Sequence, residues 1–230
     1  MFLKKYIKSF FLTILSIIFP EKCLVCDNVL NEKEKYICSH CKDNHLIKQP
    51  MKDDYFAPLI LFIKDIVVLF RYRCCERAIK SFKFYGQVSI GKRLAKLLAQ
   101  EIMKKEWAKE LDYIVPVPLH KKALRKRGFN QCEIVASVLS KELCVPVESR
   151  NLYRIRYNIP QHNLSKEERY ENISNNFSLK QPSQFKGKTI LLIDDVITTC
   201  STLKACCQAL KESEDITIYI SALSSTRIKF

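Results

Sequence analysis

The segment that most constrains the fold of this chain is TILLIDDVITTCST, at residues 189–202. It opens with an unbroken apolar run, which in a strand indicates a sheet covered on both faces. We expect this strand to present Asp194 and Asp195 at its C-terminal end, followed by a hydroxyl-rich loop and a helix. Ligands bind at that edge in open α/β sheets, so the segment predicts both a fold class and a site.

The rest of the chain alternates between strand and helix patterns. Strand composition, apolar and β-branched, is found at 65–71, 113–117, 189–193 and 216–223. Helical spacing of apolar residues is found at 73–85, 88–106, 129–143 and 201–211. In the second of these helices we expect one shared inward face, formed by Ile90, Leu94, Leu97, Leu98 and Ile102, and we expect Asn130 to cap the third. Residues 150–175 are polar and irregular, with a short helix predicted at 166–173. We therefore predict an α/β fold with a mostly parallel sheet flanked by helices.

Composition narrows the function. Hydrophobic residues make up 47% of the 230 residues, which is enough for a core. The chain has only four glycines, too far apart for a Walker A or G-x-G-x-x-G loop. Nucleotide binding through such loops is therefore excluded. A formal net charge of +15 favours polyanionic partners such as phosphates, nucleic acid or an anionic membrane surface.

Four of the eleven cysteines form two C-x-x-C pairs separated by eleven residues: Cys23, Cys26, Cys38 and Cys41. Two such pairs can surround one zinc ion tetrahedrally, and four thiolates leave no open position for catalysis. We therefore expect a structural zinc site, with free thiols or a redox pair as the alternatives. The odd cysteine total and the length of the chain argue against a disulfide scaffold, so we expect a reducing, cytoplasmic location.

The N-terminus combines lysines with an apolar stretch at 10–19 and resembles a signal peptide. No small-x-small cleavage site follows it, and the stretch is too short to span a bilayer. We expect a helix packed on the domain and no transmembrane segment, with weak membrane-surface association as the alternative. The predicted order is a helix at 1–19, a zinc-ribbon module at 20–45, a linker at 46–64 and the α/β domain at 65–230.

The loop after the two carboxylates has the chemistry of a phosphate site. Hydroxyl groups and unpaired backbone N–H groups at a helix N-terminus suit a phosphate, and adjacent carboxylates suit ribose hydroxyls and Mg²⁺. The predicted phosphate-binding residues are Thr198, Thr199, Cys200, Ser201 and Thr202. The alternative is that Asp195 caps a turn and the threonines cap the helix.

Two basic segments are candidates for anion binding. No acidic residue lies between Asp112 and Glu133, and the cations there would meet either pyrophosphate or a nucleic-acid backbone. The second segment, 70–85, interleaves cations with aromatic residues, as single-strand binders do. For the aromatic residues we favour the alternative of amphipathic packing, with the aromatic side chains in the core and the cations on the surface.

The segment at 190–202 resembles the phosphoribosyl pyrophosphate motif of type I phosphoribosyltransferases. Together with the C-x-x-C pairs, VPVPLHKKALRKRGFNQ at 115–131 and PQHNLSKEERYEN at 160–172, it resembles the ComF family of bacterial competence-related proteins over nearly the whole chain. The resemblance implies that Asp194 and Asp195 bind ribose hydroxyls, directly or through Mg²⁺, and that the loop at 198–202 holds the 5′-phosphate. It also implies a pyrophosphate loop at the turn 115–119. The candidate anion-binding residues are Pro118 in that turn and Lys121, Arg125 and Arg127 in the basic segment that follows it.

Two functions follow from that resemblance. The first is phosphoribosyl transfer to an unknown acceptor, within a role in natural transformation. The second is a non-catalytic factor that binds single-stranded DNA or a DNA-uptake helicase. The chain departs from the family at Cys200, where a glycine is usual, and at Ile159. A Cβ at position 200 would narrow the phosphate cup or force a strained backbone. Lys83 and Tyr85 lie in SFKFYG, a family element, and are expected to approach the cleft.

Overall fold

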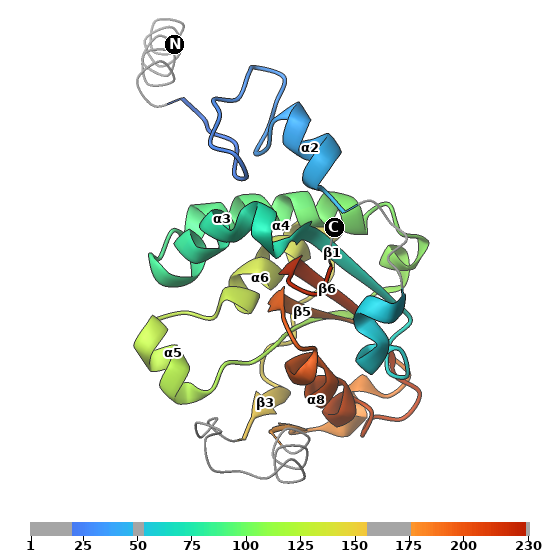
Figure 1. The fold of residues 1–230 in the computed structure, drawn as a ribbon. Helices are drawn as coiled ribbons and strands as arrows, with labels where there is room; N and C mark the ends of the chain where they lie inside the picture. The colour runs from blue at the N-terminus through green and yellow to red at the C-terminus, as the bar shows by residue number, and fades with distance from the viewer. Residues whose placement is uncertain (1–19, 48–52, 156–175, 229–230) are drawn as a thin grey trace, which may run out of the picture. The chain divides into compact units, whose positions relative to one another are not determined.

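The computed structural model describes residues 20–47, 53–155 and 176–228 (Figure 1). The chain divides into two compact units, Met1–Leu46 and Ile47–Phe230. The helices expected at 1–19 and 166–173, and the departure at Ile159, lie outside the described residues. Within those residues, no helix has the length and apolar character needed to cross a membrane.

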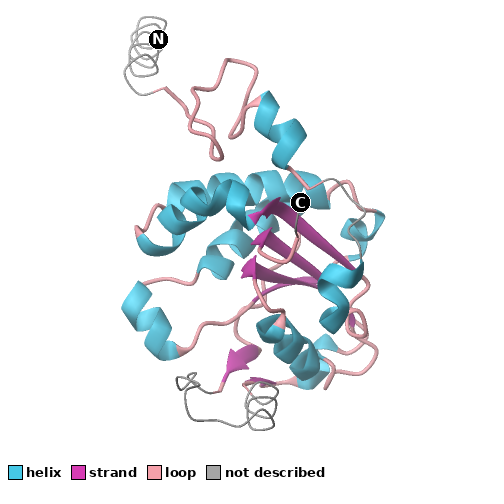
Figure 2. Cartoon of the chain, viewed as in Figure 1, coloured by secondary structure: helices cyan, strands magenta, loops and turns pink. Residues whose placement is uncertain are grey.

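The larger unit is built on a four-stranded parallel sheet with the strand order β1-β6-β5-β2 (Figure 2). The strands are β1 (Asp65–Arg71), β2 (Tyr113–Pro116), β5 (Thr189–Ile197) and β6 (Thr217–Ser225). Helices α3, α4 and α6 lie on one side of the sheet and α8 on the other (Figure 1). Their bounds are α3 (Tyr72–Phe84), α4 (Val88–Ile102), α6 (Gln131–Leu143) and α8 (Ser201–Leu210). The predicted α/β fold with helices on both faces is confirmed.

Shorter elements connect these layers. They are α2 (Ser39–His45) in the smaller unit, and η1 (Asp53–Leu59), η2 (Glu106–Glu110), α5 (Lys121–Arg127) and η4 (Pro182–Phe185) in the larger one. Strands β3 (Leu152–Arg154) and β4 (Phe177–Leu179) form a separate antiparallel pair. Strand β3 lies within the stretch 150–175, which was expected to be irregular. The sequence of that stretch does not reveal this strand, because β3 is paired with β4, which lies outside the stretch.

The boundaries differ from expectation in three places. Strand β5 continues through the two carboxylates to Ile197, because its pairing with β6 persists to the Ile197–Ser225 pair. Helix α4 ends at Ile102, four residues early. Of its predicted inward face, Leu94, Leu97, Leu98 and Ile102 are buried and Ile90 is half-buried. The basic segment after β2, expected as a loop, contains helix α5.

The segment expected as a linker at 46–64 contributes to the core of the larger unit instead. Phe56 and Leu59 of η1 are buried in the same hydrophobic cluster as Leu203 and Leu210 of α8. Two buried apolar side chains in a short turn were not recognised because the turn carries no helical or strand periodicity. The larger unit thus begins before residue 65.

The contact between α3 and α4 yields a first prediction. Gly91 of α4 faces the ring of Phe82, and a Cβ at position 91 would overlap that fully buried ring. We expect Gly91→Ala to lower the free energy of unfolding by about 1–3 kcal/mol through overpacking. Urea denaturation of both forms measures the change. The exposed position Ser89 of the same helix supplies the control, since Ser89→Ala gains helix propensity without a clash and should not destabilise.

Candidate functional site

The smaller unit brings the four cysteines together. The first pair lies in a turn closed by Cys23 N–H donating to the Asn28 carbonyl, and the second pair lies at the start of α2. The four sulfur atoms all lie within 4.8 Å of one another, and the Cys26 and Cys38 sulfurs are 3.7 Å apart. A tetrahedron with metal–sulfur bonds of 2.3 Å has edges of about 3.8 Å. The cluster therefore fits one tetrahedral metal ion, and its sulfurs are too far apart for a disulfide.

Backbone donors favour the thiolate form of one cysteine in this cluster, Cys23. The N–H groups of Val25 and Cys38 donate to the Cys23 sulfur at 3.5 and 3.4 Å. Burial raises the pKa of the Cys23 thiol, but backbone hydrogen bonds outweigh burial and lower the pKa to about 7. Hydrogen bonding to the charged form favours a thiolate, which is the form that binds metals.

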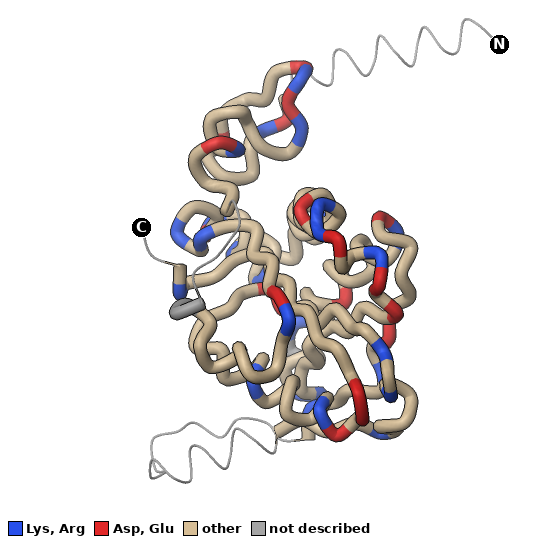
Figure 3. The backbone as a smooth tube through the Cα atoms, turned by 90° about the vertical axis from the view of Figure 1, so that its right-hand side faces the viewer, with Lys and Arg blue, Asp and Glu red and all other residues tan. Residues whose placement is uncertain are grey.

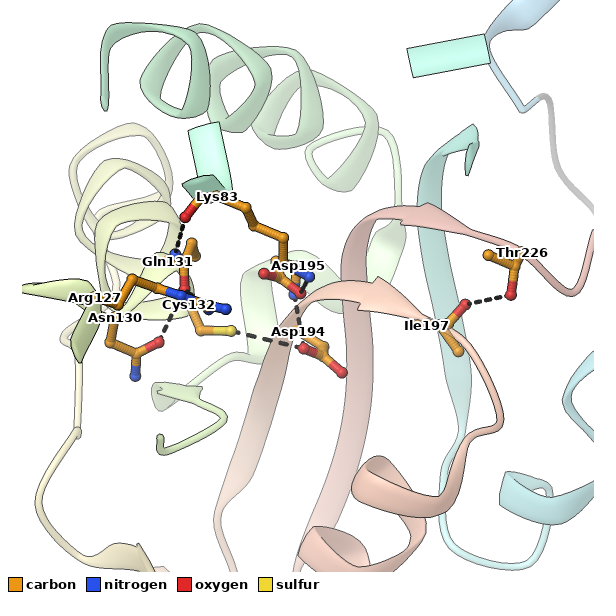
Figure 4. Close-up of polar contacts among 9 residues, drawn as sticks. All are labelled: Lys83, Arg127, Asn130, Gln131, Cys132, Asp194, Asp195, Ile197 and Thr226. Carbon is orange, nitrogen blue, oxygen red and sulfur yellow. Dashed lines mark hydrogen bonds and ion pairs between the residues drawn. The ribbon is translucent and has the colours of Figure 1, made fainter. Parts of the chain in front are cut away.

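In the larger unit, Asp194 and Asp195 lie near the C-terminal end of β5, and each contacts a different helix (Figure 4). An Asp195 carboxylate oxygen, Oδ1, lies 2.9 Å from Nζ of Lys83 in the last turn of α3. The corresponding oxygen of Asp194 accepts the Asp195 backbone N–H at 2.8 Å and the Cys132 thiol at 3.7 Å. The end of one strand thus contacts two helices, α3 and α6, which lie on the same side of the sheet.

The two carboxylates differ in electrostatic environment. Burial, together with the negative charge of Asp195, raises the pKa of Asp194 from its ordinary value of 3.8 to about 7. Among the described residues, the partners of Asp194 are a backbone N–H and a thiol, whereas Asp195 is paired with an ammonium group. The charge of Lys83 also lowers the pKa of Asp194, but burial and Asp195 outweigh it, and Lys83 makes its direct ion pair with Asp195.

The hydroxyl-rich loop connects β5 to α8 directly. Thr198 and Thr199 are exposed, and the Thr199 and Ser201 hydroxyl oxygens lie 2.9 Å apart. The Ser201 backbone N–H also donates to the Thr199 hydroxyl oxygen at 3.4 Å. The loop thus presents the hydroxyl groups that the sequence predicts for anion binding, next to a helix N-terminus, while capping contacts occupy part of them.

Cys200 is held in the left-handed conformation, with φ 65° and ψ −4°. The sequence resemblance implies a glycine at this position, and a residue with a Cβ in this conformation carries the expected backbone strain. The side chain is only 3% exposed and packs in the hydrophobic cluster beneath α8. The Cys200 thiol therefore lies in the core. The main effect of cysteine in place of glycine at this position is strain in the backbone.

This conformation yields a second prediction. We expect Cys200→Gly to be more stable than Cys200→Ala by about 1 kcal/mol, because a Cβ in the left-handed region costs about 1–2 kcal/mol. Both variants lose the buried thiol, so their comparison isolates the backbone. Thermal melts of the pair measure the difference. Were the alanine variant the more stable one, which is the usual order, the backbone at position 200 would be unstrained.

The four predicted anion-binding residues do not lie in one place in the structure. Lys121 and Arg125 are exposed on α5, and neither contacts the carboxylates among the described residues. Arg127 is half-buried and donates to the Gln131 side-chain oxygen at 2.7 Å. Pro118 follows the end of β2, where the Val117 N–H donates to the Ile193 carbonyl on β5. Of these four residues, two are connected to the carboxylates through hydrogen bonds of their neighbours. Pro118 follows the residue that bonds to β5, and Arg127 bonds to Gln131, which in turn bonds to the Lys83 carbonyl.

The residues around the two carboxylates were predicted only in part from the sequence. Asn130 caps α6 as expected, since its side chain accepts the Cys132 N–H at 3.0 Å. Lys83 does approach the carboxylates, whereas Tyr85 is 76% exposed. The contacts of Gln131 and Cys132 were missed, because nothing in their local sequence indicates which side chains α6 will face. In the second basic segment, Phe70 and Phe82 are core residues and Phe84 is exposed, so packing explains only part of that pattern.

The chain is similar to a known protein family, to several named proteins and to solved structures. The family described as "Phosphoribosyl transferase domain" matches residues 90–224. Competence protein F of Haemophilus influenzae is 30% identical over 182 residues, covering 77% of this chain and 75% of that protein. DNA utilization protein YhgH of Salmonella typhi is 33% identical over 176 residues, covering 75% and 70%. Among solved structures, a purine phosphoribosyltransferase from Pyrococcus horikoshii is 18% identical and covers 62% of this chain and 76% of that one, with a TM-score of 0.39.

Proposed function

The chain belongs to the phosphoribosyl transferase domain family and to the competence protein F family, and we propose from this premise that it binds phosphoribosyl pyrophosphate together with Mg²⁺. We propose further that it works in DNA uptake in the cytoplasm, where its metal-binding cysteines remain reduced. The ligand would place its ribose at the end of β5 and its 5′-phosphate on the loop at 198–202.

One observation carries the proposal. The two carboxylates and the hydroxyl-rich loop follow one another on a single strand–loop–helix unit, at the carboxyl edge of a parallel sheet. Ligands of open α/β folds bind at this edge, and a helix N-terminus there favours an anion. The carboxylates can accept hydrogen bonds from sugar hydroxyls, and the loop that follows them can donate hydrogen bonds to a phosphate. Together they suit a phosphorylated sugar.

The residues present also suit Mg²⁺. This ion prefers carboxylate oxygens and is commonly held by one or two carboxylates plus the phosphates of a substrate. Asp194 has no cationic partner among the described residues, so it would hold the ion, which would neutralise charge on the diphosphate. The four-cysteine cluster suits Zn²⁺ instead, because soft thiolates favour that ion and a closed set of four favours a structural role.

In a transfer reaction, the chain would bind and orient the sugar while pyrophosphate departs. Asp194 and Asp195 would hold the ribose end, and the loop at 198–202 would hold the 5′-phosphate. Lys121 and Arg125, exposed on α5, would meet the departing anion if this segment closes over the site. Preorganised positive charge of that kind stabilises charge that develops as a bond breaks.

Calorimetric titration of phosphoribosyl pyrophosphate into the zinc-loaded full chain tests the proposal. We expect binding in the presence of Mg²⁺ and strong weakening in its absence. Release of pyrophosphate in the presence of candidate nitrogen acceptors would then establish turnover. A folded, zinc-loaded protein that binds none of the ligand with Mg²⁺ would contradict the proposed site.

A second candidate function is direct binding of single-stranded DNA. Two observations favour it: the relatives are named for competence and DNA utilization, and Lys121, Lys122 and Arg125 are exposed on one short helix. Lys and Arg are otherwise spread around the larger unit and interspersed with acidic residues (Figure 3). A binding surface would therefore be local to α5 rather than general.

Salt dependence tests this second function. We expect single-stranded DNA affinity to fall with added salt, and Lys121→Ala/Lys122→Ala/Arg125→Ala to reduce both the affinity and the salt slope, by about 0.7 for each lost phosphate contact. A control variant removes equal charge from exposed lysines elsewhere: Lys104→Ala/Lys109→Ala/Lys186→Ala. Equal weakening in both variants would mean that net charge, not α5, determines binding.

A further inference from the structure

We propose that Lys83 is a ribose-binding residue, which acts with Asp195 as a paired donor and acceptor for the sugar hydroxyls and leaves Asp194 to the divalent cation. This inference rests on the proposed function and assigns different roles to two carboxylates that are adjacent in sequence. It adds a residue from α3, far from the loop that carries the phosphate chemistry.

Within the described part of the chain, the ion pair between Lys83 and Asp195 leaves hydrogen-bond donors of the ammonium group unused. Nζ of Lys83 lies 2.9 Å from Oδ1 of Asp195, and the two side chains are only 21% and 10% exposed. An ammonium group has three donors, and a carboxylate accepts at both oxygens. Among the described residues Asp195 is the only partner of this ammonium group, so donors remain for a ligand. Partial burial makes such unused donors expensive, and a polyhydroxyl ligand would satisfy them.

The backbone of Lys83 is held in place by contacts with α6 and with the core. Its backbone carbonyl, in the last turn of α3, accepts a hydrogen bond from the Gln131 side-chain amide at 3.4 Å. Gln131 is 1% exposed and is itself held by Arg127. The preceding residue, Phe82, is fully buried and stacks on Phe129 at 6.0 Å. Lys83 is thus a positioned group on a rigid element, as binding sites require, and not a mobile surface lysine.

The two carboxylates differ in their contacts (Figure 4). Asp195 is in direct ion-pair contact with Lys83, whereas the hydrogen-bond partners of Asp194 among the described residues are a neutral N–H group and a thiol. A divalent cation is attracted more strongly to the carboxylate that is not in direct contact with an ammonium group. A vicinal diol both donates and accepts hydrogen bonds, so an ammonium–carboxylate pair complements it. The arrangement therefore directs the metal to Asp194 and the hydroxyls to Asp195 and Lys83.

The experiment compares Lys83→Met with a matched control on the same helix. Lys80→Met removes an exposed ammonium that pairs with Glu76 at 2.8 Å and lies away from the carboxylates. Calorimetry with phosphoribosyl pyrophosphate and Mg²⁺ should show at least a tenfold loss of affinity for Lys83→Met and no change for Lys80→Met. Melting temperatures of both variants verify that each is folded.

A second measurement separates hydroxyl recognition from a merely structural role. Ribose 5-phosphate and 2-deoxyribose 5-phosphate are used to displace phosphoribosyl pyrophosphate from each form. The wild type should prefer the ribose compound at least several-fold, and Lys83→Met should lose that preference. The inference is overturned if the wild type does not distinguish the two sugars, or if Lys83→Met keeps the wild-type preference.

The failures of the two proposals are distinguishable. If the folded wild type does not bind phosphoribosyl pyrophosphate with Mg²⁺, the proposed function fails and this inference fails with it. If the wild type binds and Lys83→Met binds equally well, the proposed function stands and the role of Lys83 alone is refuted.

Discussion

Removal of metal from the four-cysteine cluster is expected to unfold residues 20–46 while the larger unit remains folded. Structural zinc contributes about 10–16 kcal/mol in zinc-finger peptides near pH 7. The smaller unit has few buried apolar side chains to replace that contribution: Leu24, Tyr36 and Ile37 are its buried apolar side chains among the described residues, besides the cysteines. Hydrogen exchange of the full chain, before and after chelation, should show loss of protection confined to this segment.

Single substitutions locate the effect. Cys41→Ser should reduce the zinc content from about one ion per chain to near zero, since three thiolates no longer close the shell. Cys144→Ser, at an exposed cysteine of the larger unit, should leave both zinc content and protection unchanged. Retention of hydrogen-exchange protection at 20–46 in the chelated protein would show that the metal is not what folds this module.

Asp194→Asn is expected to abolish binding of phosphoribosyl pyrophosphate with Mg²⁺, with at least a hundredfold loss of affinity, and at the same time to stabilise the fold at pH 8. Burial and the charge of Asp195 hold the pKa of Asp194 at about 7, above its unfolded value. The charged form is therefore unfavourable in the native state above about pH 7. Asparagine removes this penalty, by about 1 kcal/mol or more, because each pKa unit is worth about 1.4 kcal/mol.

The adjacent residue should behave differently in stability. Asp195→Asn should also weaken ligand binding, but it leaves Lys83 partly buried without its counter-ion and should therefore lower the melting temperature. Asp112→Asn is the matched control, since that carboxylate pairs with Lys188 near the start of β2 and should not affect binding. Unchanged ligand affinity in Asp194→Asn would refute the metal-binding role of this carboxylate.

The same pKa predicts how binding depends on pH. Asp194 must be ionised to hold a cation, so the affinity of the wild type for the magnesium complex should fall as the pH decreases through about 7. The decrease should approach tenfold per pH unit at most, since one proton is involved. Calorimetry between pH 6 and 8, at constant ionic strength, measures it, and a flat profile would mean that Asp194 is already ionised.

Local sequence determined much of this molecule. Apolar runs and helical spacing located the four parallel strands and the four main helices, because side-chain periodicity is a property of a few consecutive residues. The spacing of the cysteines defined their cluster for the same reason, and Asn130 identified the start of α6. The hydroxyl-rich loop followed from one uninterrupted segment of sequence.

Only the tertiary structure decided which distant side chains share the site. Lys83 reaches Asp195 because α3 and β5 pack in one unit, and Cys132 reaches Asp194 across 62 residues of sequence. The burial of Phe56 and the length of β5 likewise depend on partners, namely α8 and β6. Periodicity states which face of an element is apolar, but the identity of the opposing element depends on the packing of the whole chain. The carboxylates were therefore predictable from sequence, and the difference between them was not.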